Sequence, residues 1–125
     1  MKNLSKDYLV ECQNALAAEQ AHSLSTTENW AHVDKALVHK DWDALYQNLA
    51  KHIDATPVDD ATIQLFIKQH FDIACRFYTP SKEAYIGMAL FYEHNKDMKD
   101  FHNAYHPEMV SYLGNAMVLF AEHNL

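Results

Sequence analysis

Glycine and proline are so scarce in this chain that a fold built on tight turns is disfavoured. The 125 residues include two glycines and three prolines, well under half of the roughly 12% that these residues usually make up together. Antiparallel sheets need them at their turns, so a β-sandwich or β-barrel is not expected. A glycine-rich phosphate-binding loop is also excluded, because Gly87 and Gly114 are the only glycines.

Apolar residues recur at helical spacing along the whole chain, which predicts an all-α domain of five to seven helices. The clearest break lies at residues 56–60, where Pro57 disfavours helix in the residue before it and Asp60 can cap the next helix. Residues 79–81 form a second break of the same kind. The predicted helices cover residues 4–22, 26–55, 60–78, 82–94, a short segment around 98–105 and a final helix that opens at Pro107.

The segment 26–55 contains a slip in the apolar pattern. Thr26 is a suitable N-cap, but the stripe that begins at Trp30 is one residue out of phase with the stripe that contains Trp42. One long helix with a kink near His39 accounts for the slip, and so do two successive helices.

Size and charge narrow the function classes. A chain of 125 residues and 14.4 kDa forms one ordinary domain. Ten basic against 17 acidic side chains give a net charge of −7, so direct nucleic-acid binding is not expected. No apolar run approaches the ~20 residues of a membrane span, and residues 1–7 lead into no signal-peptide pattern. With only two cysteines, the sequence predicts a protein of the reducing cytoplasm.

Two tryptophans, seven tyrosines, six phenylalanines and nine histidines stand out in the composition. Flat amphipathic rings suit a cleft for a large heteroaromatic ligand, although most aromatic residues on an apolar stripe simply pack in a core. Both interpretations stay open for each residue, and His70 is either a hydrogen-bonded core residue or a ligand contact. The residues that we predict to contact a ligand are Trp42, Tyr46, His70, Phe71, Tyr78, Tyr92, Phe101 and Tyr105.

The sequence contains no catalytic or metal-binding motif that stands out. His102 and His106 have the four-residue spacing of helical metal ligands, but no third ligand is placed beside them, so we expect both to be solvated. The aspartates at 41–43 and 59–60 are too close in sequence to face each other on a helix. The sequence therefore predicts neither an enzyme nor a cofactor or metal site.

Four patches from residue 26 onward resemble the TipAS domain, the antibiotic-recognition domain at the C-terminus of some MerR-type transcription activators. They are Thr-Thr-Glu-Asn-Trp at 26–30, the stretch from Lys68-Gln69-His70 to Tyr78-Thr79-Pro80, Phe91-Tyr92 followed by Phe101-His102-Asn103-Ala104-Tyr105, and the closing helix from Pro107 with Tyr112-Leu113 and Ala116-Met117. The order and spacing of the patches make the resemblance specific, whereas residues 1–22 match poorly.

The resemblance implies one globin-like domain without haem, with residues 1–25 as an N-terminal helix and linker and residues 26–125 as the ligand-binding domain. In the family, an aromatic cleft closes over bulky antibiotics such as thiopeptides, and an attached DNA-binding module reads the change. This chain is not expected to contain that module. The resemblance therefore predicts sequestration of an antibiotic-like molecule in drug resistance, or transcription regulation through another polypeptide. A helical protein-interaction module with a purely structural aromatic core is the alternative.

One feature of the thiopeptide-binding prototype is missing. The prototype has a cysteine after its aromatic-proline turn, where the thiol adds to a dehydroamino acid of the drug. Here the turn at 78–82 reads Tyr-Thr-Pro-Ser-Lys, and Cys75 lies before it. Because Cys12 and Cys75 both fall on apolar stripes, we predict two core thiols and non-covalent ligand binding.

Overall fold

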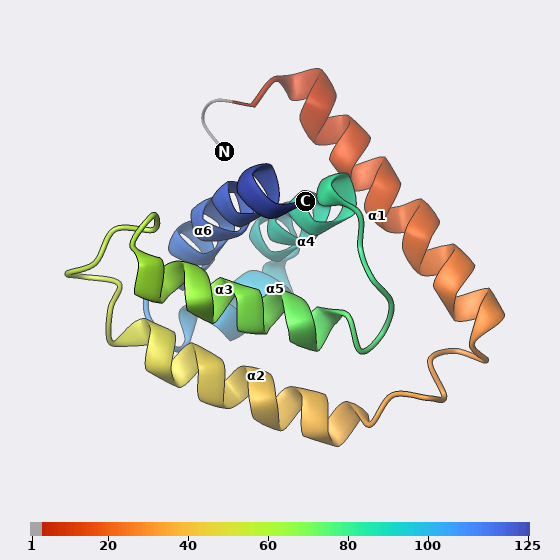
Figure 1. The fold of residues 1–125 in the computed structure, drawn as a ribbon, viewed down its shortest axis with the longest axis horizontal. Coiled ribbons are helices and arrows are strands. Elements are labelled where there is room, and N and C mark those ends of the chain that lie inside the picture. Colours follow the sequence, from red (N-terminus) through yellow and green to blue (C-terminus); the bar gives the residue numbers. More distant parts are fainter. Residues whose placement is uncertain (1–3) are drawn as a thin grey trace.

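The computed structural model describes residues 4–125, which form six α-helices and no strand (Figure 1). The helices are α1 (Lys6–Thr26), α2 (Lys35–Ala50), α3 (Ala61–Ala74), α4 (Lys82–His94), α5 (Lys96–Asn103) and α6 (Met109–Asn124). The all-α, globin-like fold expected from the sequence is confirmed. None of these six helices is both long and apolar enough to cross a membrane. Residues 1–3, part of the segment for which no signal peptide is predicted, lie outside the described residues.

Side-chain caps set the start of most helices. The Asp60 side chain accepts a hydrogen bond from the N–H of Thr62, at the first predicted break. At the second, the Ser81 hydroxyl accepts one from the N–H of Ala84. Both breaks and the bounds of α4 are therefore confirmed, whereas α2 and α3 are shorter than the sequence predicts.

The prediction that Thr26 begins the second helix is wrong. α1 continues to Thr26, and residues 27–34 form an irregular segment, here called the strap, before α2 begins. Three consecutive residues of the strap, Glu28, Asn29 and Trp30, have φ angles of 53°, 60° and 63°. Residues other than glycine rarely adopt this left-handed conformation, so the local sequence gives little sign of it.

The strap also explains the slip in the apolar pattern. Trp30 is not helical, and α2 runs through His39 without a break, so neither a kink nor a second helix start lies there. The Thr27 hydroxyl donates to the Ser23 carbonyl at 2.6 Å and accepts the Trp30 N–H at 3.0 Å. These two bonds join the end of α1 to the left-handed turn.

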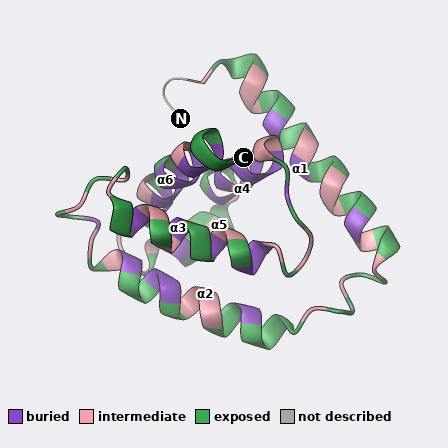
Figure 2. Ribbon diagram, viewed as in Figure 1, coloured by how far each residue is buried: buried purple, intermediate pink, exposed green. Residues whose placement is uncertain are grey.

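α4 and α6 are the two most buried helices, with seven of 13 and nine of 16 residues buried. α4 packs against α1, α5 and α6. α3, which the sequence predicts as the central helix, packs against α2 and α6. Buried positions face the middle of the molecule and exposed positions follow the outer sides of α1 and α2 (Figure 2). Since α1 packs mainly on α4, it forms one edge of the domain.

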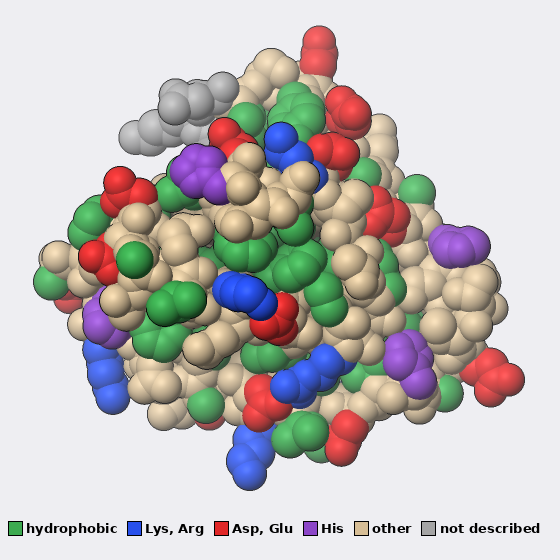
Figure 3. All heavy atoms as spheres, in the orientation of Figure 1, with side chains coloured by type: hydrophobic (Ala, Val, Ile, Leu, Met, Phe, Trp, Pro, Cys, Tyr) green, Lys and Arg blue, Asp and Glu red, His purple; other side chains and the backbone are tan. Residues whose placement is uncertain are grey.

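Charged side chains are distributed over the surface. On the face drawn in Figure 3, Lys and Arg side chains form no large cluster and several of them lie beside acidic ones, while hydrophobic side chains gather near the centre. Arg76 pairs with Asp41 at 2.7 Å, and Lys68 pairs with Asp72 at 3.1 Å. This face therefore offers no basic cluster to a phosphate backbone.

Gly87 allows α1 and α4 to approach closely. A Cβ atom at this position would lie 2.4 Å from the carbonyl oxygen of Cys12 and 3.0 Å from Cβ of Leu16. The nearer obstacle is backbone, which a side-chain rotation cannot relieve. Gly87 therefore fixes the spacing between these two helices.

We predict that Gly87→Ala destabilises the protein. Alanine in a helix interior normally stabilises by about 1 kcal/mol relative to glycine, but here the clash with α1 reverses the sign. We expect the free energy of unfolding to fall by roughly 1–3 kcal/mol, measured by urea denaturation. Glu93→Ala, on the exposed side of α4, is the control and should change it by less than about 0.5 kcal/mol. A Gly87→Ala variant more stable than the parent would contradict the close approach.

Candidate functional site

An apolar cleft without charged side chains lies between α1, the strap, the segment that joins α3 to α4, and α4, and α2, α3 and α5 each add one residue to its lining. Its volume is about 180 Å³, below the ~300–1,000 Å³ of typical ligand pockets and close to the ~150 Å³ of a cavity that admits benzene. One or two fused rings match this volume. The residues that line the cleft are Leu16, Gln20, Trp30, Trp42, Ala74, Phe77, Tyr78, Pro80, Met88, Phe91, Tyr92 and Met98.

Aromatic rings and thioethers form the walls of the cleft. The rings of Trp30 and Phe77 pack edge to face with centroids 4.9 Å apart, and Trp42 stacks on Phe77 at 6.2 Å. Met88 and Met98 add flexible, polarisable side chains that adapt to irregular shapes. A flat apolar group in this cleft would bury area against several rings at once.

Hydrogen bonds hold the strap at the cleft. Nε2 of His32 donates to the carbonyl oxygens of Arg76 and Phe77, both at 3.1 Å. Nε1 of Trp30 donates to the Ser23 hydroxyl at 2.8 Å. These bonds offset the conformational cost of the left-handed residues, which is about 1–2 kcal/mol for each, and keep Trp30 in the wall.

Behind the cleft, fully buried side chains from four helices form one hydrogen-bonded network, here called the buried network. Tyr85 Oη lies 2.8 Å from His70 Nδ1, and His70 Nε2 lies 3.1 Å from Tyr46 Oη. Tyr46 Oη is also 3.1 Å from His102 Nε2, whose Nδ1 is 2.7 Å from the Met98 carbonyl oxygen. Each of the four side chains is at most 1% exposed.

The acceptors fix the position of every proton in the buried network. The Met98 carbonyl can only accept, so His102 carries its hydrogen on Nδ1 and accepts at Nε2 from Tyr46. His70 must then donate from Nε2 to Tyr46 and accept at Nδ1 from Tyr85. Every donor is satisfied with both imidazoles neutral, which is the condition under which buried polar groups stabilise a core.

Burial keeps the network uncharged. Desolvation, with a smaller contribution from the neighbouring His102, lowers the pKa of His70 to about 3. Desolvation also lowers the pKa of His102 and raises the pKa values of Tyr46 and Tyr85 well above their usual range. The two histidines and two tyrosines of the network therefore keep the same protonation state near neutral pH. Their role is to stabilise the packing of the helices.

Three of the eight residues predicted to contact a ligand line the cleft: Trp42, Tyr78 and Tyr92. Two of them also rest on the buried network. Trp42 stacks on His70 with ring centroids 5.5 Å apart, and Tyr92 stacks on His102 at 4.3 Å. The network therefore supports the floor of the cleft.

The structure places the other predicted residues away from the cleft lining. Tyr46 and His70 belong to the buried network. Phe71 is partly buried against the core, Phe101 is 48% exposed, and the hydroxyl of Tyr105 donates to Asp43. Of the eight predicted residues, three therefore line the cleft, two belong to the buried network behind it, and three belong to neither.

The expectation that His102 is solvated is wrong, since it is 1% exposed. Apolar periodicity favours Phe101 as the inward residue of α5, but α5 turns His102 inward because Tyr46 and the Met98 carbonyl satisfy its ring. Hydropathy alone gives no signal for such a histidine.

Sequence reasoning missed most of the cleft lining, including Leu16, Trp30, Phe77, Met88 and Met98. Met88 and Tyr92 are one helical turn apart, and this spacing could have indicated that both residues lie on the face of α4 that lines the cleft. Leu16 and Trp30 reach the cleft only through the packing of α1 on α4 and the left-handed turn of the strap.

Neither cysteine lines the cleft. Cys12 is fully buried beside Gly87, and Cys75 is half-buried. Desolvation raises the pKa of both thiols. Both are therefore poor nucleophiles near neutral pH.

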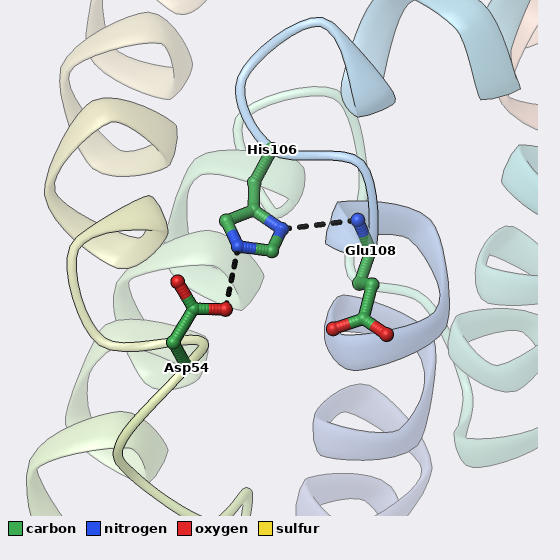
Figure 4. Close-up of side chains that lie close together, drawn as sticks. All are labelled: Asp54, His106 and Glu108. Atoms are coloured by element: carbon green, nitrogen blue, oxygen red, sulfur yellow. Dashed lines mark hydrogen bonds and ion pairs between the residues drawn. The ribbon is translucent and has the colours of Figure 1, made fainter.

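His106 lies between two acidic residues at the surface (Figure 4). Its Nε2 is 2.9 Å from Oδ1 of Asp54, and its Nδ1 accepts the backbone N–H of Glu108 at 3.0 Å. One potential ligand atom from each of the three residues lies within 4.8 Å of the others. The hydrogen bonds account for this cluster, because they join the turn after α2 to the turn before α6. A metal would have to replace the proton on Nε2 of His106. The absence of a metal site stays a prediction.

Comparison with known proteins identifies one family. The family model of the TipAS antibiotic-recognition domain matches residues 10–120, which include most of α1 and all of the cleft lining. The sequence resemblance places a boundary between residues 1–25 and a ligand-binding domain at 26–125. The match begins before that boundary, and α1 runs across it. No curated protein and no solved structure gives a significant match.

We predict that Tyr46→Phe destabilises the protein much more than Tyr105→Phe. Loss of the Tyr46 hydroxyl leaves His70 Nε2–H and His102 Nε2 unpaired in the core, which should cost at least about 2 kcal/mol. The Tyr105 hydroxyl bonds to Asp43 in a half-buried position, and its loss should cost roughly 1 kcal/mol or less. Urea denaturation of the two variants measures the difference. Equal losses would show that the Tyr46 hydroxyl contributes no more stability than the half-buried hydrogen bond of Tyr105.

We also predict that stability falls as the pH drops below about 6.5. The unfolded state binds a proton on His70 near its ordinary pKa of roughly 6.5, whereas the folded state resists protonation down to about 3. Protonation therefore favours unfolding throughout that window. His70 alone should lower the free energy of unfolding by about 1.4 kcal/mol between pH 7.5 and 5.5, measured by urea denaturation at each pH. The exposed-site variant His39→Gln should show the same fall, and a flat profile would contradict a neutral, buried His70.

Proposed function

The chain belongs to the TipAS antibiotic-recognition domain family, and on that premise we propose that it binds a bulky aromatic small molecule of the antibiotic class without chemical change. The observation that carries the proposal is the cleft lined by aromatic rings and methionines, with no charged side chain in its walls. Such a cleft favours a flat, poorly soluble molecule over a sugar, a nucleotide or an anion.

The hydrogen bonds and ion pairs of the titratable side chains support a proposal of binding without catalysis. The buried histidines are uncharged and fully hydrogen-bonded, so neither has a free position for a substrate proton. Asp41 is paired with Arg76, and Asp43 accepts hydrogen bonds from Tyr105 and Gln47. The family is one of ligand recognition, which agrees with binding as the whole activity.

A ligand larger than the cleft can use the hollow beside it. That hollow has a volume of about 500 Å³ and shares Phe77 and Tyr78 with the cleft. Its other lining residues are mainly polar, and they include Glu19, His22 and Ser23. We propose that an aromatic part of the ligand occupies the cleft and that the remainder extends over Phe77 and Tyr78.

In the cell, the proposed role is sequestration of the ligand in the cytoplasm, or regulation of transcription through another polypeptide. The alternative, a protein-interaction module, needs one continuous apolar face. The large exposed hydrophobic residues among residues 4–125 lie one on each of five helices and one at the C-terminus: Val10, Leu37, Leu65, Phe91, Phe101 and Leu125. We favour the cleft as the functional site because it gathers aromatic rings from several elements around one cavity.

We predict that Met88→Trp blocks binding. The larger side chain fills the wall of the cleft, so affinity for the compound that most raises the melting temperature in an antibiotic library should fall at least about tenfold, roughly 1.4 kcal/mol. Leu65→Trp is the matched control, because Leu65 is 62% exposed on α3 and lies outside the cleft lining. Calorimetric titration measures both variants. Unchanged affinity in Met88→Trp would place the ligand elsewhere.

We also predict that binding is non-covalent. The protein is incubated with a dehydroalanine-containing thiopeptide and examined by intact mass spectrometry. No adduct is expected, because Cys12 is buried, Cys75 is half-buried outside the cleft lining, and both thiols have raised pKa values. The Cys75→Ala variant should bind the thiopeptide with the same affinity as the parent protein. An adduct that disappears in Cys75→Ala would show that this thiol reaches the ligand.

A further inference from the structure

Two buried polar atoms, each on a residue that lines the cleft, have no hydrogen-bond partner. They are Nε1 of Trp42 and Oη of Tyr78, and within residues 4–125 they are the only buried side-chain nitrogen and oxygen atoms in this condition. The two residues come from different elements, yet both line the same cleft. Folded proteins pair nearly all buried polar atoms, so two unpaired atoms at one cleft need an explanation.

The second tryptophan of the cleft provides an internal comparison. Trp30 lines the cleft as Trp42 does, but its Nε1 donates to the Ser23 hydroxyl at 2.8 Å. The fold therefore satisfies one indole of the cleft and leaves the other unsatisfied. Stacking on His70 at 5.5 Å and on Phe77 at 6.2 Å fixes the orientation of the Trp42 ring.

Both unpaired groups are available as donors. An indole N–H can only donate. Burial, with a contribution from Glu19, raises the pKa of Tyr78 to about 12, so its hydroxyl keeps its proton near neutral pH. A charged ligand group would find no counter-charge in the cleft lining and would lose its hydration.

We propose that the group bound in the cleft is a neutral aromatic ring system that carries hydrogen-bond acceptors, either ring nitrogen or carbonyl oxygen, and that these pair with Trp42 Nε1 and Tyr78 Oη. The inference rests on the proposed function and names the chemical class of its ligand. Both atoms are covered in the free protein, so the ligand displaces the side chains over them as it enters. The cleft then favours a ring with an acceptor over a hydrocarbon of the same shape.

The test is an NMR titration of the ¹⁵N-labelled protein with quinoline and with naphthalene, which differ by one ring nitrogen. We expect quinoline to bind about tenfold more tightly, the effect of one net hydrogen bond. If Trp42 is the donor, its indole N–H signal should move downfield with quinoline, whereas naphthalene should cause only a ring-current shift. The indole signal of Trp30, whose N–H is already paired, should not show the downfield change.

Conservative variants identify the donor. Trp42→Phe and Tyr78→Phe keep an aromatic ring and remove one donor each, so the preference for quinoline should disappear in one of them. It should persist in Trp30→Phe. Equal affinity of the two probes in the parent protein, or an unchanged preference in both variants, would overturn the acceptor inference while the cleft remains a binding site. If neither probe changes the signals of cleft residues, the proposed function itself fails.

Discussion

The buried network of Tyr85, His70, Tyr46 and His102 is the constraint on which the cleft depends. These side chains come from α4, α3, α2 and α5, and together they join four of the six helices through one continuous set of hydrogen bonds. Because each proton position is determined by its acceptor, a shift of any one helix leaves a buried polar atom unpaired. Trp42 and Tyr92 stack on the two imidazoles, so the network sets the position of the cleft floor as well as the core.

The opposite wall depends on two backbone features. Gly87 lets α1 lie directly against α4, which brings Leu16 to the cleft. The left-handed residues of the strap, which follows the C-terminal end of α1, then turn the chain so that Trp30 reaches the cleft. The apolar cleft lies between these walls and its floor.

Local signals made much of the fold predictable. Asp60 and Ser81 cap the helices that the sequence assigned to them, and apolar spacing identified the all-α class. The strap was not predictable in this way, because three consecutive non-glycine residues with positive φ contradict local preference and are held by tertiary bonds such as those of His32. The cleft was predictable only in part. Trp42, Tyr78 and Tyr92 lie on it, but Tyr46 and His70 lie behind it and His102 replaces Phe101 as the inward residue of α5.

The central claim is that this cleft, supported by the buried network, receives the ligand, and its methionines allow a direct measurement. Met88 and Met98 line the cleft, whereas Met109 and Met117 are fully buried in the core. In a titration of protein labelled with ¹³C at its methionine methyl groups, quinoline should shift the signals of Met88 and Met98 and show intermolecular nuclear Overhauser effects to them. The signals of Met109 and Met117 should stay in place. Binding of quinoline that leaves Met88 and Met98 unchanged would contradict the account.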